Sequence, residues 1–216
     1  MNRVELRAKI REITELTEDD ASDVVIDFYA RDGFERIINL ERRWPFFESS
    51  NTLTLTPGDP DYPISSIGDG GLREVVSLFD NDSLYHLQLI DMGTGERTWG
   101  VTASGRPTHW SRWANTVRMW PKPSSATTLV VRGYRKPAEW WNSDATEIDC
   151  DERLHAAIVY YVISRLYQLQ EDVELSNFYA QTFAESASTA KEEIMRVSAQ
   201  SPIILNRGVT LPGSMF

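Results

Sequence analysis

The sequence is poor in the features that build disulfides, membrane spans and secretion signals. It contains one cysteine, Cys150, so an intramolecular disulfide and a zinc site with several cysteine ligands are both excluded. No segment approaches the ~20 consecutive apolar residues that a membrane-spanning helix needs. The first residues, MNRVELRAKIREI, alternate charged with aliphatic side chains and lack the apolar block of a signal peptide. We therefore expect a protein that is made inside the cell and does not enter a membrane.

Basic charge is also scarce. The chain has 22 lysines and arginines against 32 aspartates and glutamates, which gives a formal net charge of −10. Tight binding to DNA requires several cations on one face, because each cation that neutralises a phosphate releases counterions. The acidic excess makes a DNA-binding regulator the weakest hypothesis. It suits a protein that DNA passes without being held.

Motifs that mark catalytic or cofactor sites are missing too. The sequence has no GxxxxGK, HExxH, GxSxG or CxxC pattern. Gly68, Gly70 and Gly71 resemble a phosphate-binding loop, but no lysine follows them, so they favour a turn. Cys150 precedes a predicted helix, where the pKa of a thiol can be lowered, and His155 follows it without an indicated third partner. We predict no catalytic residue, no cofactor and no metal site.

Two further clusters have structural explanations that we prefer. Asp59 and Asp61 lie in a turn, and the twelve-residue pattern of a calcium-binding EF-hand is absent. The stretch HWSRWANTVRMW combines three tryptophans with Arg112 and Arg118, as in some surfaces that bind single strands or sugars. Alternate side chains of a strand point to opposite faces, so half of these groups are expected in a core. We therefore expect core or subunit-contact aromatics here.

The start of the chain shows the periodicity of amphipathic helices. Residues 1–48 are expected to form two helices. Asn2 and Glu5 fit a capping box at the start of the first, and the second starts near residues 20–22 and ends before Pro45. The apolar positions recur three or four residues apart: Leu6, Ile10, Ile13 and Leu16 in the first helix, and Val24, Val25, Phe28, Phe34, Ile37, Ile38 and Leu40 in the second.

The middle of the chain, residues 49–148, is expected to form an inserted β domain. Short runs of strand character are separated by Gly, Pro, Asn and Asp, which favours a compact antiparallel sheet or a small sandwich. All seven tryptophans lie between Trp44 and Trp141, so we expect this domain to have its own aromatic core. Beyond the alternating stretch that starts at Asn51, the expected strands are 74–79, 83–90, 106–114, 116–120 and 127–134.

Residues 149–200 return to a helical pattern. Asp149 and Glu152 fit a second capping box. The apolar stripes of two helices follow: Leu154, Ala157, Ile158, Tyr161, Val162, Leu166 and Leu169, and then Phe178, Phe183, Ala187, Ala190, Ile194 and Val197. Each of the four helices has one apolar face and needs the others to cover it. We predict an α+β fold, in which two N-terminal and two C-terminal helices form a four-helix bundle and the antiparallel β domain is inserted between them.

The last segment, residues 201–216, is expected to be an extended C-terminal arm. It holds short apolar runs between Pro and Gly and has no partner of its own. Such a segment either folds back on its own bundle or adds itself to a neighbouring chain as a strand or plug. We favour the second alternative and predict that the partner-binding residues are Ile203, Ile204, Leu205, Val209, Leu211, Met215 and Phe216.

Several motifs together resemble the head–tail adaptor, or connector, proteins of tailed bacteriophages. They follow one another in the order of that family, between the expected N-terminal and C-terminal helices, and the resemblance covers about residues 1–200. The motifs are RWPF at 43–46, LTL at 53–55, DYP at 61–63, VRMWPKP at 117–123 and LVVRGYRKP at 129–137. The glycine-rich stretch at 66–71 and the double tryptophan Trp140–Trp141 have no counterpart in that pattern.

The resemblance implies a structural protein of the virion neck, made in the host cytoplasm, without catalytic activity or cofactor. Adaptors of this kind form a ring of twelve copies beneath the portal and bind tail or nozzle proteins on the far side. They line the channel through which double-stranded DNA passes without specific binding, and their C-terminal segments commonly reach into the portal. The implied partners are therefore other copies of the chain, the portal and a tail or nozzle protein, with no membrane.

Two other functions stay open on the sequence alone. A tail-terminator or nozzle subunit would also be a structural ring protein, with different partners. A phage-encoded hydrolase or carbohydrate-binding module could use the tryptophan-rich strands, and it would have no need of a ring. Light scattering or negative-stain imaging separates these classes, because a ring has a defined symmetry and an enzyme of this size does not require one.

Overall fold

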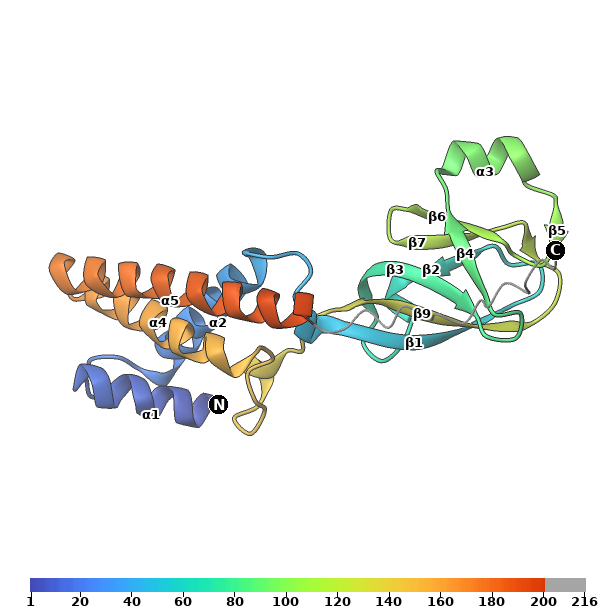
Figure 1. Cartoon of the computed structure of the whole chain (residues 1–216). Helices are drawn as coiled ribbons and strands as arrows, with labels where there is room; N and C mark the ends of the chain where they lie inside the picture. Colours follow the sequence, from blue (N-terminus) through green and yellow to red (C-terminus); the bar gives the residue numbers. More distant parts are fainter. Residues whose placement is uncertain (201–216) are drawn as a thin grey trace, which may run out of the picture.

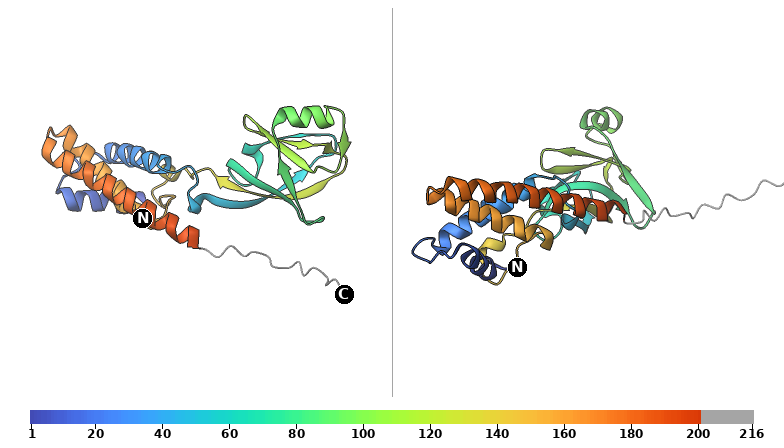
Figure 2. Two further views of the ribbon diagram at one scale, coloured as in Figure 1. Left: turned by 45° about the horizontal axis from the view of Figure 1, so that its top comes forward. Right: turned by 60° about the vertical axis from the view of Figure 1, so that its left-hand side comes forward.

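The computed structural model describes residues 1–200, which form a helical lobe and a β lobe (Figures 1 and 2). Two long strands, β1 and β9, run from the helical lobe into the β lobe and connect them. The fold is mixed α+β, with five α-helices and a large curled sheet. The helices are α1 (Arg3–Thr14), α2 (Asp23–Asn39), α3 (Met92–Trp99), α4 (His155–Leu169) and α5 (Val173–Gln200).

The first helix begins as its sequence predicts. The Asn2 side chain accepts a hydrogen bond from the Glu5 backbone N–H at 3.0 Å, and the Glu5 carboxylate accepts one from the Asn2 backbone N–H at 3.0 Å. These two bonds satisfy donors that a helix start otherwise leaves free. The helix ends at Glu15, which adopts the left-handed conformation with φ of 57°. The capping-box prediction for α1 is confirmed.

The buried face of α2 differs from the predicted one. Phe34 and Ile37 are buried as expected, together with Ile26, Ala30 and Gly33. Val24 and Phe28 were predicted to share this face, but they are 78% and 66% exposed. Positions 26, 30, 33 and 37 form one stripe at spacings of four and three, and residues 24 and 28 fall outside it. The prediction treated all the apolar side chains of the helix as one face.

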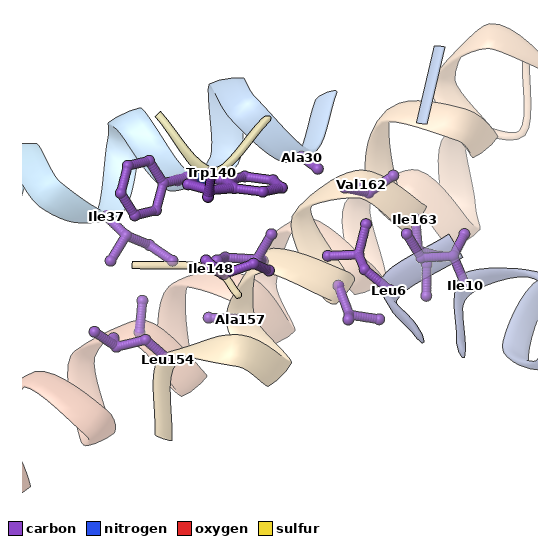
Figure 3. Packing of buried hydrophobic residues seen from close by; sticks show 14 of the residues in the cluster. Leu6, Ile10, Ala30, Ile37, Trp140, Ile148, Leu154, Ala157, Val162 and Ile163 are labelled. Atoms are coloured by element: carbon purple, nitrogen blue, oxygen red, sulfur yellow. The ribbon is translucent and has the colours of Figure 1, made fainter. Parts of the chain in front are cut away.

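The core of the helical lobe gathers side chains from all four of its helices (Figure 3). Gly33 has no side chain, and an added Cβ would lie 2.8 Å from Cδ1 of Tyr161, so glycine lets α2 approach α4 closely. Trp44 and Trp140 are also fully buried here. The aromatic core predicted for the β domain is therefore divided, because three of the seven tryptophans pack in the helical lobe: Trp44 and Trp140 in its core and the half-buried Trp141 against it.

The predicted capping box at Asp149 is wrong. A short 3₁₀ turn, η4 (Glu152–Leu154), precedes α4, and Asp151 caps it by accepting from the Arg153 backbone N–H at 3.1 Å. Asp149 instead accepts two bonds from Arg135, at 2.5 and 2.6 Å, and one from the Ala138 backbone N–H at 2.6 Å. A bidentate hydrogen bond from an arginine is stronger than a bond to one helix N–H, so the Asp149 carboxylate binds Arg135 and does not cap the helix.

The β lobe is built on one seven-stranded sheet in the order β1-β9-β3-β4-β6-β7-β2. Its edge strands β1 and β2 are joined by only residues 56–60, so the sheet curls back toward its own start. The strands are β1 (Glu48–Leu55), β2 (Asp61–Pro63), β3 (Leu72–Asp80), β4 (Tyr85–Leu89), β6 (His109–Trp113), β7 (Thr116–Trp120) and β9 (Thr127–Arg135); the short strands β5 (Ser104–Gly105) and β8 (Lys122–Pro123) form a separate pair.

The sheet is mixed and not fully antiparallel as predicted. Strands β4 and β6 run parallel, with Gln88 opposite His109 and Leu89 opposite Trp110. A parallel pair needs a crossover connection, and α3 supplies it. This helix was not predicted, because its sequence MGTGERTW contains two glycines. Gly95 lets α3 lie directly on Trp120, whose ring would be 2.4 Å from an added Cβ.

Charged side chains join the two lobes. Arg43, which follows α2, donates to the Glu74 carboxylate of β3 at 2.6 Å, and Arg42 adds an ion pair with Glu74 at 3.3 Å. Glu74 is buried, and the hydrogen bond from Arg43 holds its pKa below the usual range although burial acts in the opposite direction. Together with the Arg135–Asp149 pair, this contact fixes the base of β3 and β9 against the helical lobe.

Candidate partner-binding surfaces

The side chains with the most catalytic promise do not form a reactive site. Burial, together with Asp149 and Asp151, raises the pKa of the Cys150 thiol to about 12. This is the opposite of the lowered pKa considered from the sequence, and it leaves the thiol protonated and a poor nucleophile. Burial also lowers the pKa of His155. Within residues 1–200 no hydrogen bond joins the two side chains, and Cys150 is a small, half-buried residue that packs against the helical core.

The glycine and aspartate motifs are turns. Gly68, Gly70 and Gly71 all have positive φ and lead into strand β3, whereas a phosphate-binding loop leads into a helix. The Asp59 carboxylate accepts from the Asp61 backbone N–H at 3.0 Å, which is a local turn contact. In the part of the chain that the structure describes, no three His, Cys, Asp or Glu side chains are grouped as a metal ion requires.

The tryptophan-rich hairpin of β6 and β7 belongs mainly to the core. Trp110 and Trp120 are buried, and the Trp120 Nε1–H donates to Ser111 Oγ at 2.7 Å. Only Trp113 of the three is exposed, at 67%. One isolated ring does not make the row of stacking platforms that binding to a single strand or a sugar requires. The expectation of core aromatics is confirmed for two of the three tryptophans.

The helical lobe carries two groups of exposed apolar side chains. Val24 and Phe28 lie on α2, and Leu169, Val173 and Phe178 lie around the turn between α4 and α5. Single exposed apolar residues are normal, but neighbouring ones on regular helices are typical of surfaces that contact other molecules. Figure 1 shows that the α4–α5 turn lies at the end of the molecule farthest from the β lobe. These two groups are the first candidate contact surfaces.

Phe28 and Phe178 were both assigned to buried faces from the sequence, and the structure exposes them. A signal was present in their spacing. The buried positions of α5, at 187, 190 and 194, and the half-buried position 183 recur every four or three residues, and residue 178 lies off this stripe. The same holds for residue 28 and the stripe of α2. A strict periodicity would have marked both rings as surface residues.

A groove between α2, α4 and α5 holds two arginines around one tyrosine. The Tyr161 hydroxyl donates to the Asp32 carboxylate and accepts from Arg165 Nε at 3.0 Å. The guanidinium groups of Arg36 and Arg165 lie 5.3 and 5.1 Å from the centre of the Tyr161 ring, within the range of a cation–π contact. Burial, with the bond to Asp32, raises the pKa of Tyr161, so the hydroxyl stays neutral.

A second groove runs along the other side of the α4–α5 pair and carries carboxylates. Glu185 and Glu193 of α5 line it, with Arg153 and Tyr160 from the α4 side. Arg153 is bound by the Asp151 carboxylate at 2.8 Å, which lowers the pKa of Asp151. Thr182, Ser186, Thr189 and Ala190 complete the lining. This groove therefore has an excess of negative charge.

The predicted partner-binding residues lie outside the described part of the chain. Ile203, Ile204, Leu205, Val209, Leu211, Met215 and Phe216 all follow Gln200, where α5 ends. The structure does place the point at which the arm starts. Lys191 of α5 donates to the Leu40 carbonyl at 2.6 Å and pairs with Glu41 at 3.2 Å. The end of α5 therefore lies near the junction of the lobes (Figure 1).

Comparison with known protein families decides the class of the molecule. Residues 1–205 match the model of the family described as SU10 adaptor protein. The chain belongs to this family. This protein is therefore a phage adaptor, a structural component of the virion that associates with other virion proteins. Membership also implies that it is not an enzyme. A search of curated proteins finds no match to the chain.

None of the helices described for this adaptor combines the length and the apolar character that crossing a bilayer requires. Its longest helix, α5, has 28 residues, but glutamates and other polar side chains interrupt its apolar positions.

Proposed function

We propose that this adaptor forms a ring, of twelve copies, between the portal and the tail. The ring joins head to tail and lines the channel through which the genome leaves. The family match over residues 1–205 carries this proposal, because it makes the chain a structural adaptor of a phage. The exposed apolar side chains on α2, α4 and α5 support it, since they give a subunit surfaces that only another molecule can cover.

The helices are proposed to act as a four-helix bundle of α1, α2, α4 and α5 that forms the body of the ring. The β domain, residues 49–148, is proposed to face outward or toward the tail. Residues 1–48 carry 8 basic and 12 acidic side chains, and residues 149–200 carry 4 and 9, so the helical segments hold nearly all of the net charge. A negative wall repels duplex DNA and lets it slide without specific binding.

Imaging of portal complexes tests this proposal. Purified adaptor is mixed with purified portal particles and examined by electron microscopy. We expect a ring of adaptor density on one end of each portal, with twelve-fold order. Without portal, light scattering should give a monomer, because the portal supplies the template on which the ring closes. Portals that stay bare at saturating adaptor concentrations would contradict the proposal.

The C-terminal arm, residues 201–216, is proposed to bind the portal through its apolar residues. Deletion of the arm is expected to leave a folded and soluble protein, because residues 1–200 supply two extensive buried clusters of their own, one in each lobe. The truncated protein should lose attachment to portals by a factor of ten or more, since the apolar area that the arm contributes is missing. A pull-down with immobilised portal measures this.

A replacement of the arm by a Gly–Ser segment of the same length is the matched control. It keeps the chain length and removes the apolar side chains, so it should fail in the same way as the deletion. Attachment of either variant at the level of the full-length adaptor would refute the role of the arm, while the ring proposal would still be tested by the images of the full-length protein.

A further inference from the structure

The two sides of the α4–α5 helix pair carry opposite charge. Two helices packed side by side leave one groove on each side of their contact. On one side, the groove is lined by Arg36, Tyr161 and Arg165. On the other side, it is lined by Tyr160, Glu185, Glu193 and Arg153, and the charge of Arg153 is paired by Asp151 at 2.8 Å. Tyr160 and Tyr161 are neighbours in sequence, and successive helical positions point about 100° apart, which places them in different grooves.

The first side, here called the basic face, consists of Phe28, Arg36 and Arg165 with Tyr161 between the arginines. Asp32 supplies one carboxylate against the two guanidinium groups, through its ion pair with Arg36 at 3.2 Å and its bond from Tyr161. One carboxylate cannot neutralise two guanidinium groups, so the pair of arginines keeps a net positive charge. Phe28, Asp32 and Arg36 are each four residues apart on α2, so the exposed ring of Phe28 continues the same face.

The second side, here called the acidic face, consists of Phe178, Glu185 and Glu193. Phe178 and Glu185 are seven residues apart on α5, which places them two turns apart on one side of the helix. Phe178 is 60% exposed and touches Tyr179 edge to face, with ring centres 5.2 Å apart. Each face therefore combines an exposed phenylalanine with a net charge, which is positive on the basic face (Arg36 and Arg165 against Asp32) and negative on the acidic face (Glu185 and Glu193, with Arg153 paired by Asp151).

We propose that the basic face of one adaptor subunit packs against the acidic face of the next. The occupant of each face is a second copy of this chain. Because the two faces are different and lie on different sides of one helix pair, the contact is head to tail and repeats from copy to copy, which closes into a ring when the rotation fits. Opposite charges fix the register and discourage wrong pairings. The inference rests on the proposed function and specifies the interface that it requires.

Charge reversal tests the interface in the portal-bound ring. One variant carries Glu185→Arg and Glu193→Arg, and a second carries Arg36→Glu and Arg165→Glu. Each puts like charges across every contact, so each is expected to lower the number of rings on portals at least about tenfold. A variant with Asp82→Arg and Glu96→Arg makes the same charge change on the β lobe, at exposed positions outside both faces, and should assemble normally.

Mixing the two reversed variants in equal amounts gives the decisive result. In an alternating ring, which twelve positions allow, every contact is either a native pair or a doubly reversed pair. Rings should therefore return in the mixture. Normal assembly of either variant alone, or no recovery in the mixture when both variants give native circular dichroism, would overturn the inference.

Neutral variants keep the test valid if a reversed variant fails to fold. Glu185→Gln with Glu193→Gln retains the size of the side chains, so its rings should be fewer than those of the native adaptor and less sensitive to salt between 0.05 and 0.5 M. An unchanged salt dependence would overturn the inference. A failure of the native adaptor itself to form rings would instead refute the proposed function.

Discussion

Replacement of Trp140 by alanine is expected to destabilise the helical lobe by about 3–5 kcal/mol, which is the usual cost of removing a large buried aromatic side chain. Trp140 has no exposed surface and lies between Ala30 and Ile37 of α2 in Figure 3. Its ring meets Phe34 and Trp141 edge to face, with centres 5.9 and 6.0 Å apart. Urea unfolding followed by tryptophan fluorescence and circular dichroism measures the loss.

Two control variants separate the core role of Trp140 from a general effect of losing a tryptophan. Trp113→Ala removes an exposed ring of the β lobe and should change the free energy of unfolding by less than about 0.5 kcal/mol. Trp140→Phe keeps an aromatic ring and should cost less than the alanine variant, also because the buried Nε1–H of Trp140 finds no hydrogen-bond partner among residues 1–200. An equal loss for Trp140→Ala and Trp113→Ala would contradict this account of the core.

Replacement of Asp27 by alanine is expected to destabilise the protein by about 2–4 kcal/mol, because it removes the carboxylate that both Arg3 and Arg7 of α1 share and leaves them only their ion pairs with Asp23 and Asp144. Asp27 of α2 binds both Arg3 and Arg7, and the Arg7 Nε–H donates to its Oδ1 at 2.9 Å. The three side chains are only 12–18% exposed. The same urea titration measures the effect.

An exposed ion pair is the matched control for Asp27. Glu35 pairs with Arg31 at 3.0 Å on the surface of α2, and both side chains are about half exposed. Glu35→Ala should therefore cost less than about 0.5 kcal/mol. If the two alanine variants lose the same stability, the pairing of α1 with α2 does not depend on the buried carboxylate.

The same carboxylate makes stability depend on pH in the acid range. Burial alone would raise the pKa of Asp27, but the bonds from Arg7 and Arg3 outweigh burial and hold the pKa below its usual value. A carboxyl group whose pKa is lower in the folded state stabilises the fold fully above the unfolded pKa of about 4 and loses this contribution as pH falls through the folded value. The difference in unfolding free energy between the native adaptor and Asp27→Ala should shrink below about pH 4. A constant difference from pH 7 to pH 3 would contradict this.

Local sequence signals were sufficient where the partner of a side chain lies close in the chain. The capping box of Asn2 and Glu5 and the strand at residues 116–120 are present as predicted, because a helix start and a hairpin depend on neighbouring residues. The local signals failed where the contacts of a residue are made with a partner that is distant in the sequence. Asp149 fits a cap but is bound by Arg135. The glycines of α3 argue against a helix, yet Gly95 is required there because Trp120 lies against it.

The candidate surfaces, too, depend on residues that are distant in the sequence, which local patterns do not reveal. Arg36 and Arg165 are far apart in the sequence and meet only because both lie against Tyr161 in the folded protein. No local pattern could have placed them in one groove. The exposure of Phe28 and Phe178 was accessible from strict helical spacing, but the choice of the buried stripe depends on which neighbour covers each helix. The family resemblance was recognisable from short motifs, which lie mainly in strands β1, β2, β7 and β9 and in the residues that directly follow them.

The central claim is that this adaptor forms the ring between portal and tail, and an image of the virion neck tests it most directly. Virions carrying a tagged adaptor are imaged by electron cryomicroscopy, with the tag in the exposed turn at residues 101–102, which follows α3 in the β lobe. The account predicts one ring of twelve labels between the portal and the tail proteins, with acidic helices facing the DNA channel. Labels elsewhere on the virion, or a channel wall lined by basic side chains, would contradict it.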